Sequence, residues 1–370
     1  MKFGFLSEAQ TPIGVTHHRR YWEVIDEAIL AEEMGWDFFG SSEQHFISPM
    51  ACISAPEAFY PAVAMRTSRI RLRHMVVLLP FPFNHPVRVA ERLATLDIVS
   101  NGRAEIGTGR ANTLLQLDGF QCPLDESRAR WEEGLEVLMK AFLHDPFSHE
   151  GRYFKIPPRS LCPKPVQQPH PPVSMVAQSP ESNAVAGSKG IGSLCWDVYF
   201  GWDYVERGYK AYKEAIARAK PVGGYINDSF AAVSLNVVCA ETKAEAMKAA
   251  KLSIPNFAGP VIEEIYPALA KRSESYGYLK NLEKIRAKSR DLDWLVNETS
   301  CIASDPDGFI ERFKRYEALG ANEVILRLDG THEEIKRTIT LIGRYVIPAF
   351  KAPKAVITRA QVEALAGPVP

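Results

Sequence analysis

Short apolar segments alternate with longer stretches whose apolar residues recur at helical spacing, along almost the whole 370-residue chain. This alternation is typical of parallel β/α units. Eight segments look like strands, and eight such units predict a closed (β/α)8 TIM barrel of the α/β class. The segments are Lys2–Leu6, Phe38–Ser41, Ile70–Leu79, Ala104–Gly107, Val173–Ala177, Gly192–Trp196, Ala231–Cys239 and Glu323–Leu328.

The segment from Tyr21 to Met34 shows the helical pattern most clearly. Its apolar residues at positions 24, 25, 28, 29 and 31 predict a buried face. Its acidic residues at positions 23, 26, 27, 32 and 33 predict a face that points into solvent. This two-sided pattern is expected of a helix on the outside of a barrel.

Two segments interrupt the alternation. Residues 144–172 are rich in proline, and we expect them to shape a rim of the barrel. Residues 254–300 follow the seventh strand and carry Tyr266, Tyr276, Tyr278 and Trp294. They form either helical packing or a lid over a ligand. We therefore predict one domain over residues 1–350, with both insertions at the C-terminal face. Residues 351–370 are expected to form an arm at a subunit interface.

Charge and composition exclude several classes of partner. The 44 basic and 44 acidic residues are mixed along the chain, so a nucleic-acid partner is not expected. The longest apolar run, residues 75–83, contains two prolines, and no stretch resembles a signal peptide or a membrane span. The six cysteines form no C-x-x-C motif, which predicts no metal site. A reducing, cytoplasmic location is expected.

The segment from Leu96 to Arg110 combines a helix end, a tight turn, a short strand and a Gly-x-Gly-Arg sequence. Its Asn-Gly pair suits the positive φ of a chain reversal, while Gly107 and Gly109 allow backbone to approach a ligand closely. Arg110 then offers a guanidinium fork suited to phosphate. No third glycine completes a dinucleotide-binding fingerprint. The segment therefore predicts an anion site at the mouth of the barrel.

Candidate proton-transfer groups lie at the second and third strands. Glu43, Gln44 and His45 follow the second strand, where a carboxylate and an imidazole either position a proton or form a structural hydrogen-bonded pair. His74 lies in the third strand next to Met75. The apolar residues of this strand form either a platform under a flat ligand or plain core.

A second candidate anion receptor follows the fifth strand. Gln178, Ser179 and Ser182 surround the start of a helix that has a proline in its first turn. Amides and hydroxyls at such a helix start bind anions, although ordinary N-capping explains the same residues. Together with Arg110, this turn predicts a phosphate site built from two barrel loops, and hence a phosphorylated cofactor.

In their order along most of the chain, these motifs resemble those of the bacterial luciferase-like flavin-dependent monooxygenases. The resemblance is carried by Gly35-Trp36-Asp37, Glu43-x-His45-Phe46, Leu78-Leu79-Pro80, His85-Pro86-Val87-Arg88, Leu96-Asp97-x-x-Ser100-x-Gly102-Arg103, Gly107-x-Gly109-Arg110, Gln178-Ser179-Pro180-Glu181-Ser182 and Leu319-Gly320-Ala321-Asn322-Glu323-Val324.

The resemblance implies a barrel that binds reduced FMN, supplied by a separate NAD(P)H-flavin reductase, and that activates molecular oxygen through a peroxyflavin intermediate. It implies a phosphate held beside Arg110 and the 178–182 turn, and a flavin ring above the Met75-Val76 region, where some relatives have a non-proline cis peptide bond. A homodimer is also implied. The cofactor-binding residues implied in this way are Met75, Val76, Gly109, Arg110, Gln178, Ser179 and Ser182.

Two positions depart from the luciferase pattern. Gln44 replaces the first of two adjacent histidines; its amide can orient a substrate but does not exchange protons near neutral pH. His45 is therefore the first candidate for a catalytic acid or base, followed by Glu43 and His74. Gly109 stands where luciferase has a reactive cysteine, so light emission is not expected.

The sequence thus predicts a two-component flavin-dependent monooxygenase that oxygenates a small organic substrate. Both insertions, with Trp196, Phe46 and Tyr199, are expected to shield the reaction from water. Two alternatives stay open: a deazaflavin-dependent oxidoreductase that transfers hydride without oxygen, and a non-catalytic flavin-binding protein.

Overall fold

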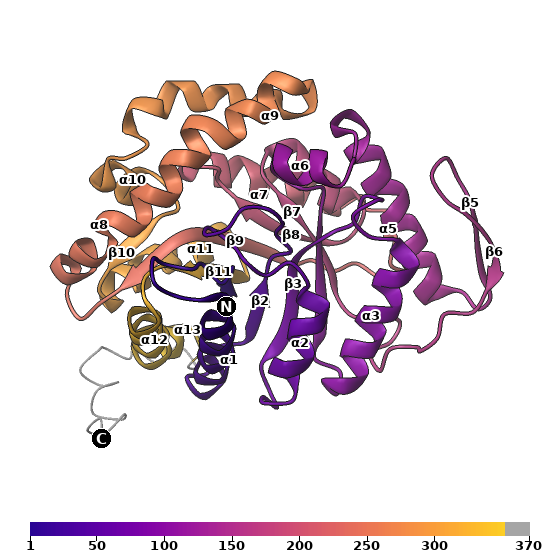
Figure 1. Ribbon diagram of the computed structural model, residues 1–370, viewed down its shortest axis with the longest axis horizontal. Coiled ribbons are helices and arrows are strands. Elements are labelled where there is room, and N and C mark those ends of the chain that lie inside the picture. Colours follow the sequence, from indigo (N-terminus) through magenta and orange to yellow (C-terminus); the bar gives the residue numbers. More distant parts are fainter. Residues whose placement is uncertain (352–370) are drawn as a thin grey trace.

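Eight parallel strands close into a barrel in the computed structural model, which describes residues 1–351 (Figure 1). Each strand pairs with the next along the chain, and the last pairs with the first and closes the ring. The predicted (β/α)8 TIM barrel is confirmed. The strands are β1 (Lys2–Ser7), β2 (Phe38–Ser41), β3 (Arg71–Leu78), β4 (Ala104–Gly109), β7 (Val173–Ala177), β8 (Gly192–Trp196), β9 (Phe230–Cys239) and β11 (Glu323–Leu328).

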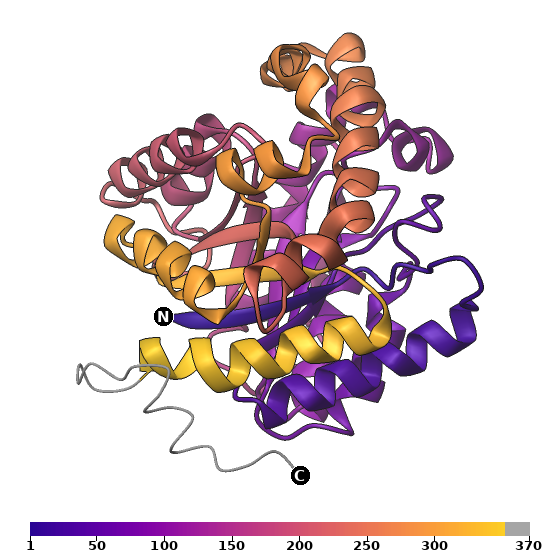
Figure 2. The same cartoon turned by 90° about the vertical axis from the view of Figure 1, so that its left-hand side faces the viewer.

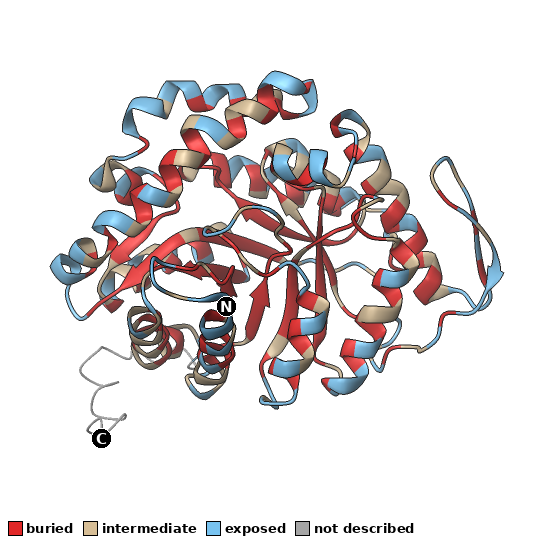
Figure 3. Cartoon of the chain, viewed as in Figure 1, coloured by how far each residue is buried: buried red, intermediate tan, exposed pale blue. Residues whose placement is uncertain are grey.

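Helices cover the outside of this barrel, and Figure 3 shows their buried sides turned toward the strands. Side-chain caps define where several helices begin; for example, Thr16 accepts the backbone N–H of Arg19 at the start of α1. The helices are α1 (His17–Glu33), α2 (Pro56–Ala64), α3 (Pro86–Val99), α4 (Leu114–Gly119), α5 (Ser127–Leu143), α6 (Pro180–Ser188), α7 (Trp202–Ile216), α11 (Pro306–Leu319), α12 (His332–Leu341) and α13 (Ile347–Lys351).

The N-terminal end of the barrel is closed by buried ion pairs. Arg73, on β3, donates to Glu323 on β11 (2.6 Å) and to Glu105 on β4 (2.5 Å). All three side chains are buried, so each charge needs the partners that the neighbouring strands supply. A ligand therefore has to enter from the opposite end, where the strands finish.

The acidic face predicted for the first helix is only partly exposed. Asp26 and Glu33 face solvent, but Glu23 and Glu27 are buried. Arg20 donates to both oxygens of Glu27 (2.6 and 3.0 Å), and His332 at the start of α12 lies 2.9 Å from the same carboxylate. Helix α12 covers this face, and α1 and α12 lie side by side in Figure 2. The expectation of an exposed face is therefore wrong for these two residues.

The first insertion does not form a rim over the barrel mouth. It contains the hairpin of β5 (Phe147–Glu150) and β6 (Lys155–Arg159), and then runs to the start of β7. There Gln167 donates to the carbonyl of Ala104, the first residue of β4, and accepts from Arg71, the first residue of β3 (both 2.8 Å). This last part of the segment lies at the N-terminal end because a connection that follows a helix must return to where the next strand begins. The hairpin itself lies along the outside of the barrel, where Phe154 packs on Phe81 and His85 in the loop after β3.

The second insertion stands over the C-terminal end of the barrel, at the top of Figure 2. It begins at Lys243, earlier than predicted, because α8 starts directly after β9. It comprises α8 (Lys243–Pro260), η2 (Val261–Ile265), α9 (Tyr266–Arg272), η3 (Glu274–Lys288) and α10 (Leu292–Glu298). It then leads into β10 (Ile302–Ser304), a short additional strand that pairs with the end of β9.

Two further predictions concern the C-terminal arm and membrane-spanning segments. The predicted arm begins at Lys351, the last residue of α13, and its remainder lies outside the described residues. Within residues 1–351, each helix is too short or too polar to cross a membrane.

Candidate functional site

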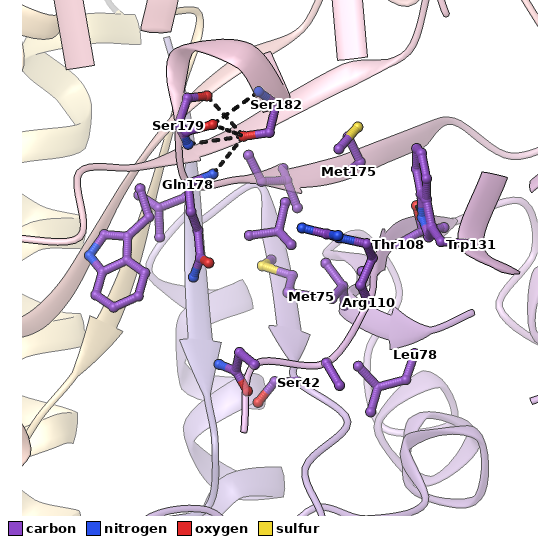
Figure 4. A pocket seen from close by; sticks show the side chains of 18 of the residues that line it. Ser42, Met75, Leu78, Thr108, Arg110, Trp131, Met175, Gln178, Ser179 and Ser182 are labelled. Atoms are coloured by element: carbon purple, nitrogen blue, oxygen red, sulfur yellow. Dashed lines mark hydrogen bonds between the residues drawn. The ribbon is translucent and has the colours of Figure 1, made fainter. Parts of the chain in front are cut away.

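A pocket of about 540 Å³ opens at the C-terminal ends of the strands, within the size range of small-molecule and cofactor sites (Figure 4). Strand residues and the turns that follow them form most of its wall, and the second insertion adds Glu274, Ser275, Tyr276 and Tyr278. The apolar part of the wall consists of Leu6, Met75, Val76, Leu78, Ala111, Trp131, Met175, Val176, Val185, Leu194, Trp196, Val233, Leu235 and Ile325.

Arg110 follows directly after β4 and lines this pocket. Its guanidinium lies over the ring of Tyr276, 4.9 Å from the ring centre. Its Nη1 atom is buried and has no hydrogen-bond partner in the described part of the chain. A buried guanidinium nitrogen without an acceptor is costly, so this atom identifies a place where a bound anion would be favourable.

The turn before α6 lies on the same pocket and carries the predicted capping residues (Figure 4). Ser182 Oγ accepts the backbone N–H groups of Gln178 (3.0 Å) and Ser179 (2.9 Å). Ser179 Oγ accepts the backbone N–H of Ser182 (3.2 Å), which completes a capping box. The capping role is therefore present. An anion bound between Arg110 and this turn would also meet the serine hydroxyls and the partial positive charge of the helix start.

Tyrosines of the second insertion are tied to both loops of the predicted phosphate site. Gln178 Nε2 donates to the hydroxyl of Tyr266 (2.8 Å), and Asn112 Nδ2 lies 3.4 Å from the same oxygen. The Tyr278 hydroxyl donates to Gln178 Oε1 (3.3 Å). Burial raises the pKa of Tyr266 and Tyr278, so both phenols stay protonated. The insertion therefore covers the pocket, as the lid hypothesis expects.

The platform predicted on β3 borders the same pocket. Met75 and Val76 both line it, and the peptide bond between them is cis. A side chain at Gly109 would bring its Cβ to 2.5 Å from Val76 Cγ2. A larger residue at position 109 would therefore displace the Val76 side chain, so glycine suits the packing of β4 against this part of β3. The predicted close approach of this backbone to a ligand stays a prediction.

Glu43 and Gln44 line the pocket, but their surroundings differ. The carboxylate of Glu43 accepts the backbone N–H of Leu78 (2.8 Å) and the side-chain amide of Asn84 (2.9 and 3.1 Å), so it fixes the end of β3. Gln44 donates to Glu8 (3.3 Å) and accepts from Gln116 (2.5 Å). Glu43 thus serves the frame of the site, whereas the amide of Gln44 belongs to a polar network in the pocket wall.

The two predicted histidines lie outside the residues that line the pocket. His45 contacts the ring of Phe120 and hydrogen-bonds Glu43 through Nε2 (3.1 Å), so it forms the structural pair that the sequence left open. His74 packs against Tyr60, and its buried Nδ1 has no partner within residues 1–351. Burial lowers the pKa of His74 to about 4. Neither ring lines the pocket, because neighbouring side chains cover both; the role of either histidine as an acid or base stays a prediction.

The aromatic residues predicted to shield the pocket divide in a similar way. Trp196 lines the pocket, and Tyr199 lies behind it, buried against the Trp196 ring. Phe46 is 63% exposed and packs on Phe120 outside the pocket. Of these three residues, only Trp196 has the predicted position.

Glu8 and Ser42 are pocket residues that the sequence-based search missed. Ser42 donates to Glu8 Oε1 (2.9 Å), and Arg327 on β11 donates to Glu8 Oε2 (2.7 Å). Arg327 also donates to Asp329 (2.6 Å). Glu8 and Ser42 each follow the carboxyl end of a barrel strand directly, which is the signal that would have found them.

Comparisons with known proteins agree with this architecture. A family model described as luciferase-like monooxygenase matches residues 1–323. The solved structure of monooxygenase RslO1 from Streptomyces bottropensis superimposes with a TM-score of 0.77 at 25% identity, covering 95% of this chain and 100% of that one.

Two kinds of enzyme and an uncharacterized protein are among the curated relatives. The oxygenase component of the flavin-dependent trigonelline monooxygenase of Acinetobacter baylyi is 24% identical over 360 residues, covering 95% of both chains. The F420-dependent glucose-6-phosphate dehydrogenase of Amycolatopsis mediterranei is 24% identical over 341 residues, covering 89% of this chain and 95% of that one. The uncharacterized protein y4wF of Sinorhizobium fredii is 33% identical over 177 residues, and this match spans about half of each protein (48% and 51%).

Proposed function

Since the chain belongs to the luciferase-like monooxygenase family, we propose that it is the oxygenase of a two-component flavin-dependent monooxygenase, which uses reduced FMN and molecular oxygen to oxygenate a small organic substrate. The family consists of oxidoreductases, and its relatives include both flavin-dependent monooxygenases and F420-dependent dehydrogenases. The choice of FMN, the separate NAD(P)H-flavin reductase and a homodimeric assembly are parts of this proposal.

The observation that carries the proposal is the unpaired, buried Nη1 atom of Arg110 in a largely apolar pocket. A phosphate monoester gives this atom an acceptor, while the apolar wall suits a flat ring system. Gln178, Ser179 and Ser182 complete the phosphate site in this proposal, and Met75, Val76 and Gly109 border the ring. The residues present therefore fit FMN.

Reduced FMN supplies the electrons with which molecular oxygen is activated. The chain contributes binding, orientation and exclusion of water. Tyr266 and Tyr278 hold the lid on Gln178, and in this proposal the lid limits the access of bulk water to the bound cofactor. We assign Gln44 to substrate orientation, since it lines the pocket. Glu43 positions β3, and His45 acts through Glu43.

A deazaflavin-dependent hydride transfer is the second candidate, because the F420-dependent relative aligns over nearly its whole length. Arg110 and the α6 turn suit the phosphate of either cofactor. Tyr266 and Tyr278 favour the monooxygenase, since a lid that excludes water has a direct use where an oxygen-derived species must be protected from loss as peroxide.

Cofactor titration separates these candidates. The full-length protein is titrated without oxygen against reduced FMN and, in parallel, against reduced F420, and the spectral change gives each Kd. Samples are then mixed with oxygenated buffer, and oxygen uptake and the flavin absorbance are followed. Tight FMN binding with delayed return of the oxidised flavin spectrum supports the monooxygenase. Binding of F420 alone, without oxygen uptake, refutes it in favour of hydride transfer.

A further inference from the structure

A second group of polar side chains lies in the pocket wall, away from the predicted phosphate site. Figure 4 shows Ser42 across the pocket from Ser179 and Ser182, with Met75 between them. Glu8 and Gln44 line the pocket beside Ser42. Glu8 accepts hydrogen bonds from both Ser42 and Gln44. These groups come from the loops after two adjacent strands, β1 and β2.

The hydrogen bonds already formed leave this group rich in acceptors. The single hydroxyl proton of Ser42 is donated to Glu8 Oε1, so toward the pocket Ser42 offers only lone pairs. The Glu8 carboxylate has about four acceptor positions, and Ser42, Gln44 and Arg327 occupy three of them. Behind Gln44, the buried Oε1 of Gln116 has no donor among the described residues.

The local charge also favours a hydrogen-bond donor at this side of the pocket. Arg327 is 1% exposed and is shared between two carboxylates, those of Glu8 and Asp329. One guanidinium therefore serves two acidic groups at this side of the pocket. The negative charge of Glu8 is therefore only partly balanced by Arg327. A donor that approaches Glu8 forms a charge-assisted hydrogen bond, which is stronger than a bond between neutral groups.

We infer that Glu8, Ser42 and Gln44 form a substrate subsite, which binds a small apolar molecule through a hydrogen-bond-donating group, either a hydroxyl or an ammonium. The apolar body of this molecule lies against Leu6, on the strand that precedes Glu8, and Ile325, on the strand that carries Arg327; both line the pocket. The inference rests on the proposed function for its premise that this pocket is the active site.

Three probes of one shape test the subsite. These are 2-naphthol, which donates a neutral hydroxyl, 2-naphthylmethylamine, which donates an ammonium, and 2-methoxynaphthalene, which only accepts. Calorimetric titration of the full-length protein, with oxidised FMN present and then absent, gives each Kd. We expect at least one donor probe to bind about tenfold more tightly than 2-methoxynaphthalene, as one hydrogen bond to a charged group provides. The tighter of the two donors tells whether hydroxyl or ammonium is preferred.

Matched variants assign the effect to Glu8. Glu8→Gln keeps a carbonyl oxygen for Arg327 but replaces the charged acceptor Oε1, which Ser42 and Gln44 contact, with an amide donor, so the preference should fall to within about threefold. Asp329→Asn removes a carboxylate from the same arginine but leaves both oxygens of Glu8 in place, and Asp329 is not one of the pocket-lining residues, so the preference should fall less than in Glu8→Gln. Ser42→Ala is the substitute if Glu8→Gln does not fold, as judged by thermal unfolding, and it too should reduce the preference.

The inference is overturned if 2-methoxynaphthalene binds as tightly as both donor probes, or if Glu8→Gln and Ser42→Ala both keep the wild-type preference. The FMN titration is read separately. Donor preference without FMN binding refutes the proposed function but supports the subsite. FMN binding and oxygen uptake without donor preference support the proposed function and refute the subsite.

Discussion

Arg110→Ala is the substitution that most directly tests the phosphate site. The Nη1 atom of Arg110 is buried without a protein acceptor, so a bound phosphate supplies the partner it lacks. A hydrogen bond to a charged group contributes about 1.5–3 kcal/mol, and each 1.4 kcal/mol changes a Kd about tenfold. Arg110→Ala should therefore weaken FMN binding by about 10- to 150-fold.

Riboflavin, which lacks the phosphate, makes this test specific. Arg110 also stacks on Tyr276, so its removal affects the lid as well as the phosphate site. A loosened lid weakens FMN and riboflavin equally, whereas a lost phosphate contact weakens FMN alone. The assay is titration of wild type and Arg110→Ala with both oxidised ligands, followed by flavin fluorescence, with unchanged circular dichroism as the check on folding.

Arg128→Ala is the matched control. Arg128 lines the same pocket, but its side chain is half exposed and pairs with Glu132 (3.3 Å). Solvent screens such a charge, so its loss should change FMN affinity by less than about threefold. Equal losses of FMN and riboflavin affinity in Arg110→Ala would refute the phosphate contact. So would equal effects of the two arginine substitutions on FMN binding.

Three further predictions concern the lid and the two histidines. Tyr266→Phe removes the hydroxyl that joins the lid to Gln178, so hydrogen peroxide should be released about two- to tenfold faster after the reduced FMN complex meets oxygen; an unchanged rate in a peroxide assay contradicts the lid role. His45→Gln should lower turnover with oxygen less than about tenfold, since its ring contacts Glu43 outside the pocket; a loss of a thousandfold or more would restore His45 as an acid or base. Burial lowers the pKa of His74 to about 4, below its value in the unfolded chain. The unfolded state therefore binds more protons between these two pKa values, so the free energy of unfolding should fall by about 3 kcal/mol as the pH drops from about 6.5 to 4. Urea unfolding at several pH values checks this, and His74→Gln should lose this part of the pH dependence; an identical pH profile in the variant refutes it.

The strand positions were predictable from the sequence because they depend on local patterns. Four of the eight predicted strands have the bounds that the structure gives them, for example Phe38–Ser41 and Val173–Ala177. Runs of β-branched and aromatic residues between turn signals carry this information within a few residues. The Ser179–Ser182 capping box is equally local, since both partners lie in one helical turn.

The first insertion shows where local pattern fails. Its prolines indicate a stiff excursion, but they do not tell at which end of the barrel it lies. The position of its last part follows from the topology, because the segment after α5 must reach the start of β7 at the N-terminal end. The second insertion leaves a strand end instead, and so it reaches the pocket.

Local sequence patterns suffice to predict the barrel, the order of its loops and the candidate groups on them, because periodicity and turn chemistry act between near neighbours in the chain. Tertiary structure decided which groups meet. It buried Glu27 against α12, placed His45 beside Glu43 and Phe120, and joined Glu8 to Arg327 across more than three hundred positions of sequence. Contacts between distant segments decide how far a side chain is buried and which hydrogen-bond partners it has. Its burial and its partners in turn decide its chemistry.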